Sequence, residues 1–200
     1  MKQFDKIGLI KHAWEIVKKN VRLIALLVGA FIVYQIIQGI VQGFFRESVL
    51  AVLVSLAFTV ITLFLEIGAI KIFLKLVDGQ KAEITELWAY PQYLLRMIGA
   101  SILFGLIVLA GFILLIIPGI YLAIRLQFYS FYIVDKNEGV IDSLQKSWKV
   151  TQGNVINLFL FMLLLVALNI LGALALLVGL LVTIPVSFIA VTLLYRKLAV

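Results

Sequence analysis

The sequence contains no cysteine and one histidine, His12. Without cysteine there can be no disulfide and no thiolate metal ligand, and a single imidazole cannot form a His–His or His–Cys metal cluster. We also find no serine, histidine and carboxylate set in the apolar segments that would give a nucleophile its base, and no glycine-rich phosphate loop. We therefore expect a protein that is not an enzyme, with no catalytic residue, no metal site and no cofactor.

Charge is also scarce, since 14% of the residues are charged, against about 25% in an average protein. Apolar residues make up 64% of the chain, and its mean hydropathy is +1.18. A water-soluble domain could not cover so many apolar residues with a polar surface, so the long apolar runs are expected to face lipid. The basic residues behind the net charge of +7 lie at the ends of these runs. A membrane surface, and no nucleic acid, is therefore the expected partner.

Six apolar segments are predicted to cross the membrane as α-helices, because a helix needs about 20 apolar residues to span about 30 Å of hydrocarbon. The first four are Val21–Phe44, Val49–Val77, Arg96–Ile117 and Ile120–Val134, with a turn at Pro118-Gly119. The run from Val155 to Leu194 is too long for one crossing, so we divide it by a turn near Gly179–Pro185. Pro185 could instead kink the sixth helix. The first apolar stretch is too long for a signal peptide and is expected to remain as an anchor.

The distribution of charge predicts the orientation of the chain. The connections on the N-terminal side carry most of the basic residues, namely Lys71, Lys75, Lys81, Arg96, Lys136, Lys146, Lys149, Arg196 and Lys197. The three opposite turns contain Arg46 as their basic residue. Because positively charged connections stay in the cytoplasm, both termini are predicted to be cytoplasmic.

The three tryptophans, Trp14, Trp88 and Trp148, share one context. Each precedes an odd-numbered span by a few residues, on an amphipathic segment. The pattern Ile7, Ile10, Trp14, Val17 recurs as Ile141, Leu144, Trp148, Thr151. Spacings of three, four and three residues place each set on one helical face.

We interpret the chain as a single membrane domain, residues 1–200, built from three repeat units at about 4–77, 78–137 and 138–200. Each unit is an interfacial amphipathic helix followed by a transmembrane hairpin. The amphipathic helices are expected to lie at the cytoplasmic headgroups, with their lysines facing anionic lipid: Lys18, Lys19, Lys146 and Lys149. The alternative is that these segments are ordinary connecting loops with interfacial aromatic residues.

Several stretches in the middle of the chain resemble the signature of a group of bacterial six-helix membrane proteins. They are residues 115–123 (LIIPGIYLA), 132–135 (YIVD) and 139–154 (ending SWKVTQGN), with 68–88 upstream. The group includes the membrane domain joined to some glycerophosphodiester phosphodiesterases. The resemblance implies a six-helix fold with cytoplasmic loops in a bacterial inner membrane. It transfers no catalytic residue, because the metal-binding carboxylate and histidine cluster of such an enzyme is missing.

Two ionisable residues, Glu66 and Arg125, lie inside predicted spans. Such residues are costly in a membrane and therefore indicate a role. One hypothesis is a buried ion pair between them that locks the second hairpin to the first. The alternative places Glu66 near the cytoplasmic boundary, partnered by Lys71 or water, while Arg125 extends its side chain to the interface.

Polar and small residues also alternate along the first span. Gln35, Gln38 and Gln42 form a stripe beside Gly39 and Gly43. The stripe could line a polar cavity, but glutamine and a GxxxG pair more often pack helices together. Similar packing roles are expected for Asn169, and for Ala175 and Gly179 as a second small-residue face.

The leading functional interpretation is an integral membrane protein that organises or senses lipid, or supports a membrane partner, through its cytoplasmic amphipathic helices. The alternative is a small transporter or channel, in which Glu66, Arg125 and the glutamine stripe line a route across an oligomer. A membrane-embedded lipid enzyme is a third interpretation, but it needs a polar cluster at the interface that we cannot assemble from the sequence. The expected partners are anionic lipids, a second copy of the chain or another membrane protein.

Overall fold

The computed structural model describes residues 4–45, 50–175 and 178–199. Every regular element within these ranges is a helix. Six segments are long and apolar enough to cross a membrane, namely Val21–Phe45, Ala51–Val77, Ile84–Leu114, Ile116–Lys136, Val155–Leu174 and Leu180–Leu198. The prediction of an all-helical chain with six candidate membrane spans is thus confirmed. Arg46 and Ser48, in the first predicted outer turn, lie outside the described residues.

The chain begins with an amphipathic helix, α1 (Lys6–Lys19). Asp5 caps it by accepting a 2.9 Å hydrogen bond from the Gly8 backbone N–H, which satisfies one of the free donors in the first turn. Ala13, Ile16 and Val17 are buried on one face, as the spacing of an amphipathic helix requires. Helix α1 packs along α9 (Leu180–Leu198), so it forms part of the bundle.

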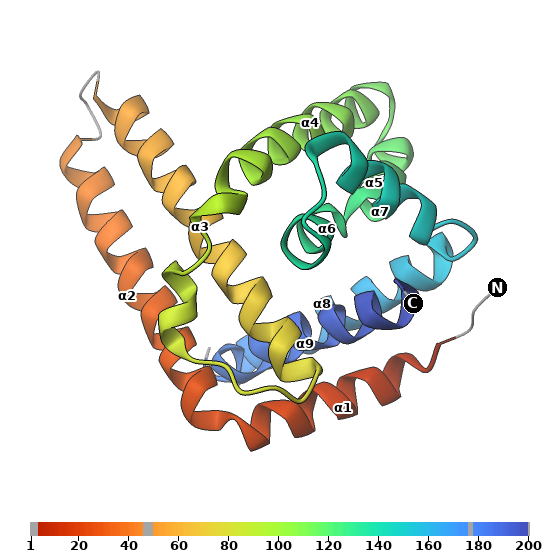
Figure 1. The fold of residues 1–200 in the computed structure, drawn as a ribbon, viewed down its shortest axis with the longest axis horizontal. Helices are drawn as coiled ribbons and strands as arrows, with labels where there is room; N and C mark the ends of the chain where they lie inside the picture. Colours follow the sequence, from red (N-terminus) through yellow and green to blue (C-terminus); the bar gives the residue numbers. More distant parts are fainter. Residues whose placement is uncertain (1–3, 46–49, 176–177, 200) are drawn as a thin grey trace.

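The long helices are arranged as antiparallel pairs (Figure 1). The hairpin of α2 (Val21–Phe45) and α3 (Ala51–Val77) projects at the upper left, and α4 (Leu94–Leu114) and α5 (Ile116–Leu126) lie at the upper right. Helices α8 (Val155–Leu174) and α9 lie next to α1 along the lower side. Two shorter helices, α6 (Tyr129–Lys136) and α7 (Val140–Val150), join these pairs. Helix α9 contacts α1, α3 and α8, whereas α6 contacts α3, α4 and α7.

The buried core lies toward the C-terminal ends of α3, α6 and α9. In α3 the buried residues fall between Leu65 and Leu76, and in α9 between Pro185 and Leu198. Tyr195, fully buried, stacks on Phe131 at 5.0 Å between ring centroids. Most of α2 and the first half of α3 instead expose large apolar side chains. This surface has the composition expected of one that faces lipid.

The turn between the third and fourth spans differs from the prediction. The chain turns at Leu115, which has extended backbone angles, and not at Pro118-Gly119. Pro118 lies in the first turn of α5, where its missing N–H costs no helical hydrogen bond. Gly119 allows α5 to approach α4 closely, because a Cβ there would lie 2.5 Å from the Phe112 ring. The predicted fourth span is also divided, since α5 ends at Leu126 and α6 begins at Tyr129.

The last hairpin turns earlier than predicted. Helix α8 ends at Leu174 and α9 begins at Leu180, so Pro185 lies inside the sixth helix, as the alternative proposed. Gly179 precedes α9 and does not belong to the fifth span. A Cβ on Gly179 would come within 2.5 Å of the Gly172 carbonyl oxygen, so these two glycines allow the turn to close.

The element around Trp88 also differs from the expected amphipathic α-helix. The chain between α3 and α4 forms two short 3₁₀ helices, η1 (Ile84–Trp88) and η2 (Pro91–Tyr93). A capping box between Glu83 and Glu86 starts η1. Of the three predicted surface helices, those near residues 4 and 138 are therefore α-helices, and the middle one is not. The three-repeat interpretation and the orientation in the membrane stay predictions.

Candidate functional site

The ends of three hairpins meet in a cluster that we call the charged junction: Asp78, Asp135, Tyr195 and Arg196. Arg196, in the last turn of α9, donates to both carboxylate oxygens of Asp78, at 2.9 and 2.6 Å. Its third contact is a 2.7 Å bond to Oδ2 of Asp135. The Tyr195 hydroxyl donates to the same oxygen at 2.9 Å. Because Asp78 caps α3 and Asp135 lies near the end of α6, one arginine holds three helix ends together.

A second set of polar contacts surrounds the charged junction. Lys75 pairs with Glu86 at 2.6 Å, which ties the end of α3 to η1. Glu86 also accepts a 3.0 Å hydrogen bond from the Tyr90 hydroxyl. Lys71 donates to the Val134 carbonyl at 3.1 Å and lies 5.6 Å from the Tyr90 ring. Lys71 was one alternative partner predicted for Glu66. In the structure its ammonium is instead hydrogen-bonded to the backbone of α6.

Sequence reasoning missed the charged junction. Val134-Asp135 and Val77-Asp78 were noted within the family-like stretches, but no contact between them was predicted. A usable signal existed, because each aspartate follows a valine at the exit of an even-numbered span and Arg196 lies at the exit of the sixth. Corresponding positions of similar hairpins end at the same side of a membrane, so opposite charges there can meet.

Arg125 is held by aromatic rings and not by a carboxylate. It is 4% exposed, and its guanidinium carbon lies 3.9 Å from the Trp148 ring centroid and 5.7 Å from that of Tyr121. Its Nε is buried without a hydrogen-bond acceptor among the described residues. The backbone around it is better satisfied, since the Arg125 carbonyl accepts from the hydroxyls of Ser147 at 3.0 Å and Thr151 at 3.1 Å.

Ser147 and Thr151 stabilise the break between α5 and α6. Besides donating to Arg125, the Ser147 hydroxyl accepts a 3.0 Å bond from the Phe128 backbone N–H. Backbone that leaves the helical pattern in a membrane protein must find such partners inside the protein. Helix α7 thus supplies the groups that the interrupted fourth span requires.

The structure does not bring Glu66 to Arg125. Among the ion pairs formed by the described residues, none includes either side chain. Glu66 is half-buried in the middle of α3. The two ionisable residues therefore belong to different environments.

The glutamine and glycine stripe of α2 has little contact with the rest of the described chain. Gln35 is exposed, and Gln38 and Gln42 are half-buried. A Cβ on Gly39 or Gly43 would meet nothing within 4 Å. The two glycines therefore pack against none of the helices that the structure describes. Asn169, by contrast, does join two helices, because its amide donates to Ser187 of α9 at 3.0 Å.

The predicted interfacial residues lie at the surface. Trp14, Trp88 and Trp148 are 42%, 57% and 37% exposed. Lys18 pairs with Glu15 at 2.6 Å, and Lys146 pairs with Glu138. Lys19 and Lys149 are exposed.

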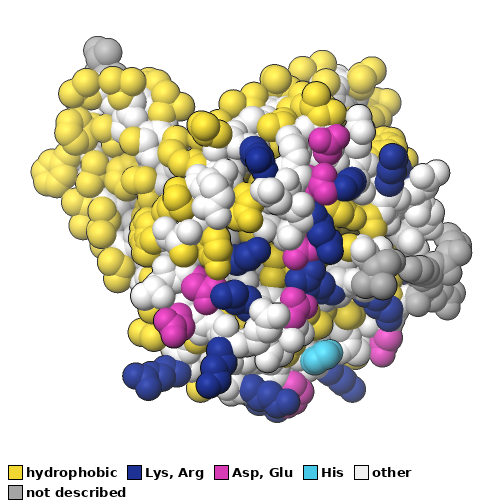
Figure 2. Space-filling model, in the orientation of Figure 1, with side chains coloured by type: hydrophobic (Ala, Val, Ile, Leu, Met, Phe, Trp, Pro, Cys, Tyr) yellow, Lys and Arg dark blue, Asp and Glu magenta, His cyan; other side chains and the backbone are white. Residues whose placement is uncertain are grey.

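Figure 2 shows that the charged side chains gather over the middle and lower part of one face. The projecting α2–α3 hairpin at the upper left is covered mainly by hydrophobic side chains. On this face the hydrophobic surface of the hairpin thus lies apart from most of the charged side chains.

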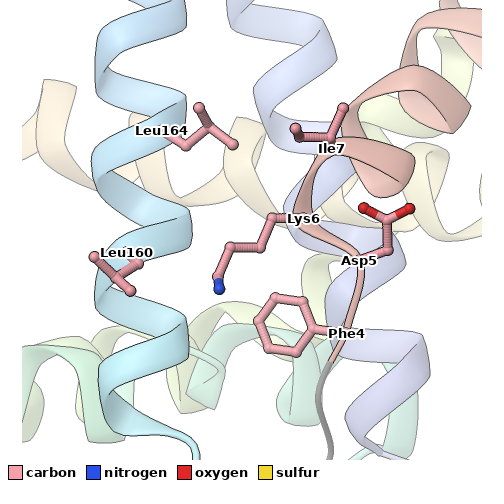
Figure 3. Close-up of a pocket in the computed structure, with 6 residues that line it drawn as sticks. All are labelled: Phe4, Asp5, Lys6, Ile7, Leu160 and Leu164. Atoms are coloured by element: carbon pink, nitrogen blue, oxygen red, sulfur yellow. The ribbon is translucent and has the colours of Figure 1, made fainter.

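An open groove separates the start of α1 from α8 (Figure 3). It has a volume of about 460 Å³ and is lined by Phe4, Asp5, Lys6, Ile7, Leu160 and Leu164. Lys6 points across it toward α8, whereas Asp5 points away. The Lys6 ammonium donates to the Asn157 side chain at 3.1 Å, and Phe4 packs edge-on against Phe161. The groove is therefore bridged by contacts that hold the N-terminal segment to α8.

Comparison with known proteins places this architecture in a family. A family model described as a domain of unknown function (DUF7847) matches residues 22–199, from the start of α2 to beyond α9. The chain belongs to the DUF7847 family. A UPF0259 membrane protein of Pectobacterium carotovorum subsp. carotovorum is 30% identical to this DUF7847 chain over 90 residues. That match covers 44% of the chain and 36% of the relative, about a third of its length. No solved structure matches. Together with the six apolar segments, these findings make the DUF7847 chain a multi-pass membrane protein.

Proposed function

We propose that this DUF7847 protein binds and orders anionic lipid at the cytoplasmic surface of a bacterial inner membrane, without catalysing a reaction. The observation that carries the proposal is the surface of α1 and α7. Each buries one face on the bundle and exposes an isoleucine and a tryptophan beside lysines. An exposed apolar edge next to basic residues is the pattern of a helix lying in the headgroup region.

Corresponding positions of the two helices support this proposal. Ile7 and Ile141 are 60% and 61% exposed, and Trp14 and Trp148 are 42% and 37% exposed. Val17 and Thr151, at the last position of each pattern, are both buried. The first and third positions of the pattern are therefore exposed and the last is buried in both helices, which favours the interpretation of α1 and α7 as repeated interfacial elements over ordinary loops.

The proposal includes the orientation of the chain. The charged junction joins the exits of the second, fourth and sixth spans, and these lie on the side that carries most lysine and arginine residues. Positively charged connections remain in the cytoplasm, so both termini are placed there. We also propose that the chain is related to the membrane domain of some glycerophosphodiester phosphodiesterases. The proposal does not include the activity of those enzymes.

A second copy of the chain, or another membrane protein, fits the same arrangement. Gly39 and Gly43 leave open space along α2, a helix with many exposed apolar side chains. Small residues at this spacing let two helices approach closely in a membrane. We propose α2 as the surface that such a partner contacts.

The proposed lipid preference can be measured with spin-labelled lipids. The full chain is placed in nanodiscs containing trace labelled phosphatidylglycerol or phosphatidylcholine, and the motionally restricted fraction is compared. We expect restriction to be at least twofold greater for the anionic lipid. Replacing Lys18, Lys19, Lys146 and Lys149 by glutamine should abolish the difference, and replacing the same four by arginine should preserve it. Equal restriction of both lipids by the unchanged protein contradicts the proposal.

Glu66 favours a second candidate function, a small transporter or channel. It is a half-buried carboxylate within α3 for which the described residues form no ion pair, and ionisable residues in membrane helices commonly mark transport pathways. Proteoliposome flux of protons and small cations tests this alternative. Flux that Glu66→Gln reduces at least tenfold supports it, whereas background flux for both proteins excludes it for those ions.

A further inference from the structure

Arg125 differs from the other arginine side chains that the structure describes in combining burial with the lack of an acceptor. Arg196 and Arg96 donate to acidic or amide oxygens, and Arg22 is exposed. Arg125 is 4% exposed, and no described residue accepts a hydrogen bond from its guanidinium. A guanidinium carries five N–H donors. The Arg125 Nε is buried without a partner, and none of the five N–H groups has an acceptor among the described residues.

Such an arrangement is costly unless something else compensates the charge. A cation that is buried without hydrogen bonds loses much of its hydration, which is unfavourable. The Trp148 and Tyr121 rings offset part of this loss through cation–π attraction. The rings, however, offer no hydrogen-bond acceptor to the N–H groups. The missing partner is an acceptor in the plane of the guanidinium.

The surroundings also fix the depth of this side chain. Arg125 lies where α5 breaks, and the α7 hydroxyls of Ser147 and Thr151 hold its carbonyl. Trp148, on the same helix, is stacked on the guanidinium and still 37% exposed. If α7 lies at the headgroups, as proposed above, the guanidinium is at the level of the lipid phosphates.

We propose that Arg125, stacked on Trp148 and Tyr121, is a binding site for a phosphate oxyanion. Guanidinium and phosphate match in a two-point geometry, with two parallel N–H···O bonds, that an ammonium does not reproduce. The two rings hold the guanidinium plane in place, so its edge is preorganised toward the anion. A phospholipid headgroup and free phosphate share this chemistry, and the inference of the headgroup as its source rests on the proposed function.

The site can be tested in the complete chain because Trp148 reports on it. In a Trp14→Phe, Trp88→Phe background, Trp148 is the sole tryptophan. The protein is titrated in neutral detergent with short-chain phosphatidylglycerol, with the diacylglycerol of the same chain length, and with inorganic phosphate, while Trp148 emission is followed. We expect a saturable change with phosphatidylglycerol and none with diacylglycerol. Arg125→Gln should weaken it at least tenfold, and Arg125→Lys should also weaken it, because the ammonium keeps the charge without the planar fork. Arg22→Gln should leave it unchanged.

The outcomes distinguish three questions: whether the oxyanion site exists, whether its phosphate comes from lipid or from solution, and whether the proposed function holds. A saturable change with inorganic phosphate that competes with the lipid supports the oxyanion site and assigns it to soluble phosphate. Equal responses to phosphatidylglycerol and diacylglycerol, or no saturable change at all, overturn the proposal. This comparison uses the protein that retains Arg125, so it remains decisive even if Arg125→Gln fails to fold. In that event anionic-lipid restriction in nanodiscs still tests the proposed function, because it depends on the surface lysines and not on Arg125.

Discussion

Arg196 bonds both carboxylate oxygens of Asp78, although 118 residues separate them. The pair connects the end of the last helix to the end of the first hairpin, and Asp135 of the second hairpin shares the same guanidinium. A two-point contact of this kind depends on the planar fork of arginine. The charged junction therefore sets the relative positions of helices that the chain connects only through long apolar segments.

Replacing Arg196 by lysine should lower the stability of the bundle. The ammonium keeps the charge but loses the second bond to Asp78, and because these side chains are 25% and 33% exposed we expect a loss of about 1 kcal/mol. Thermal denaturation in mild detergent, followed by size-exclusion chromatography, should show a midpoint lower by about 2 to 4 °C. Lys197→Ala, next to it and exposed, is the control with no expected change. An unaltered midpoint for Arg196→Lys would mean that one contact is enough.

Gly68→Ala should be more damaging than a helical glycine substitution usually is. A Cβ at this position would lie 2.4 Å from the Leu87 backbone, so η1 would have to move away from α3. We expect a loss of about 1 to 3 kcal/mol from such overpacking. The control is Gly105→Ala, where nothing lies within 4 Å and alanine's higher helix propensity should be neutral or stabilising. Similar denaturation midpoints for the two variants would contradict the close contact.

The double substitution Ser147→Ala, Thr151→Val should destabilise the break between α5 and α6. It leaves the Arg125 carbonyl and the Phe128 N–H without their side-chain partners, and each unsatisfied buried group costs about 1 to 3 kcal/mol. Hydrogen exchange measured by mass spectrometry should rise in residues 125–130. The control is Thr59→Val, which removes a hydroxyl that donates to Ser55 of its own helix and, among the described residues, bonds no other helix. Exchange in residues 125–130 should stay unchanged in this variant.

Cysteine labelling can test the predicted orientation cleanly, because the natural chain contains no cysteine. Lys146→Cys and Leu115→Cys place single thiols at exposed positions in segments predicted to lie on opposite sides. A membrane-impermeant maleimide added to intact cells should label residue 115, and residue 146 only after the membrane is opened. Labelling of both from the outside would refute the six-crossing topology with cytoplasmic termini.

Hydropathy alone located the first three spans closely, whereas the turn between the fifth and sixth was placed about five residues too late. Val21–Phe44 became Val21–Phe45, and the second helix ends at Val77 as predicted. Such runs are long and uniform, so their ends are marked by the nearest charges. The fourth span was marginal in length, and there the prediction of one continuous helix was wrong. Its division after Leu126 depends on hydroxyls from α7, which no local pattern in residues 120–134 reveals.

The sequence by itself determined that the chain is helical, that its apolar segments require lipid, and that tryptophans and lysines collect at the segment ends. These properties follow from the solvent preference of each side chain and from helical periodicity, which are local. Only the tertiary structure decided that Arg125 stacks on Trp148 and does not meet Glu66, and that Arg196 joins Asp78 to Asp135. Such choices depend on how helices pack across the bundle, because a charge in an apolar protein takes whichever partner the packed backbone brings within a few ångströms.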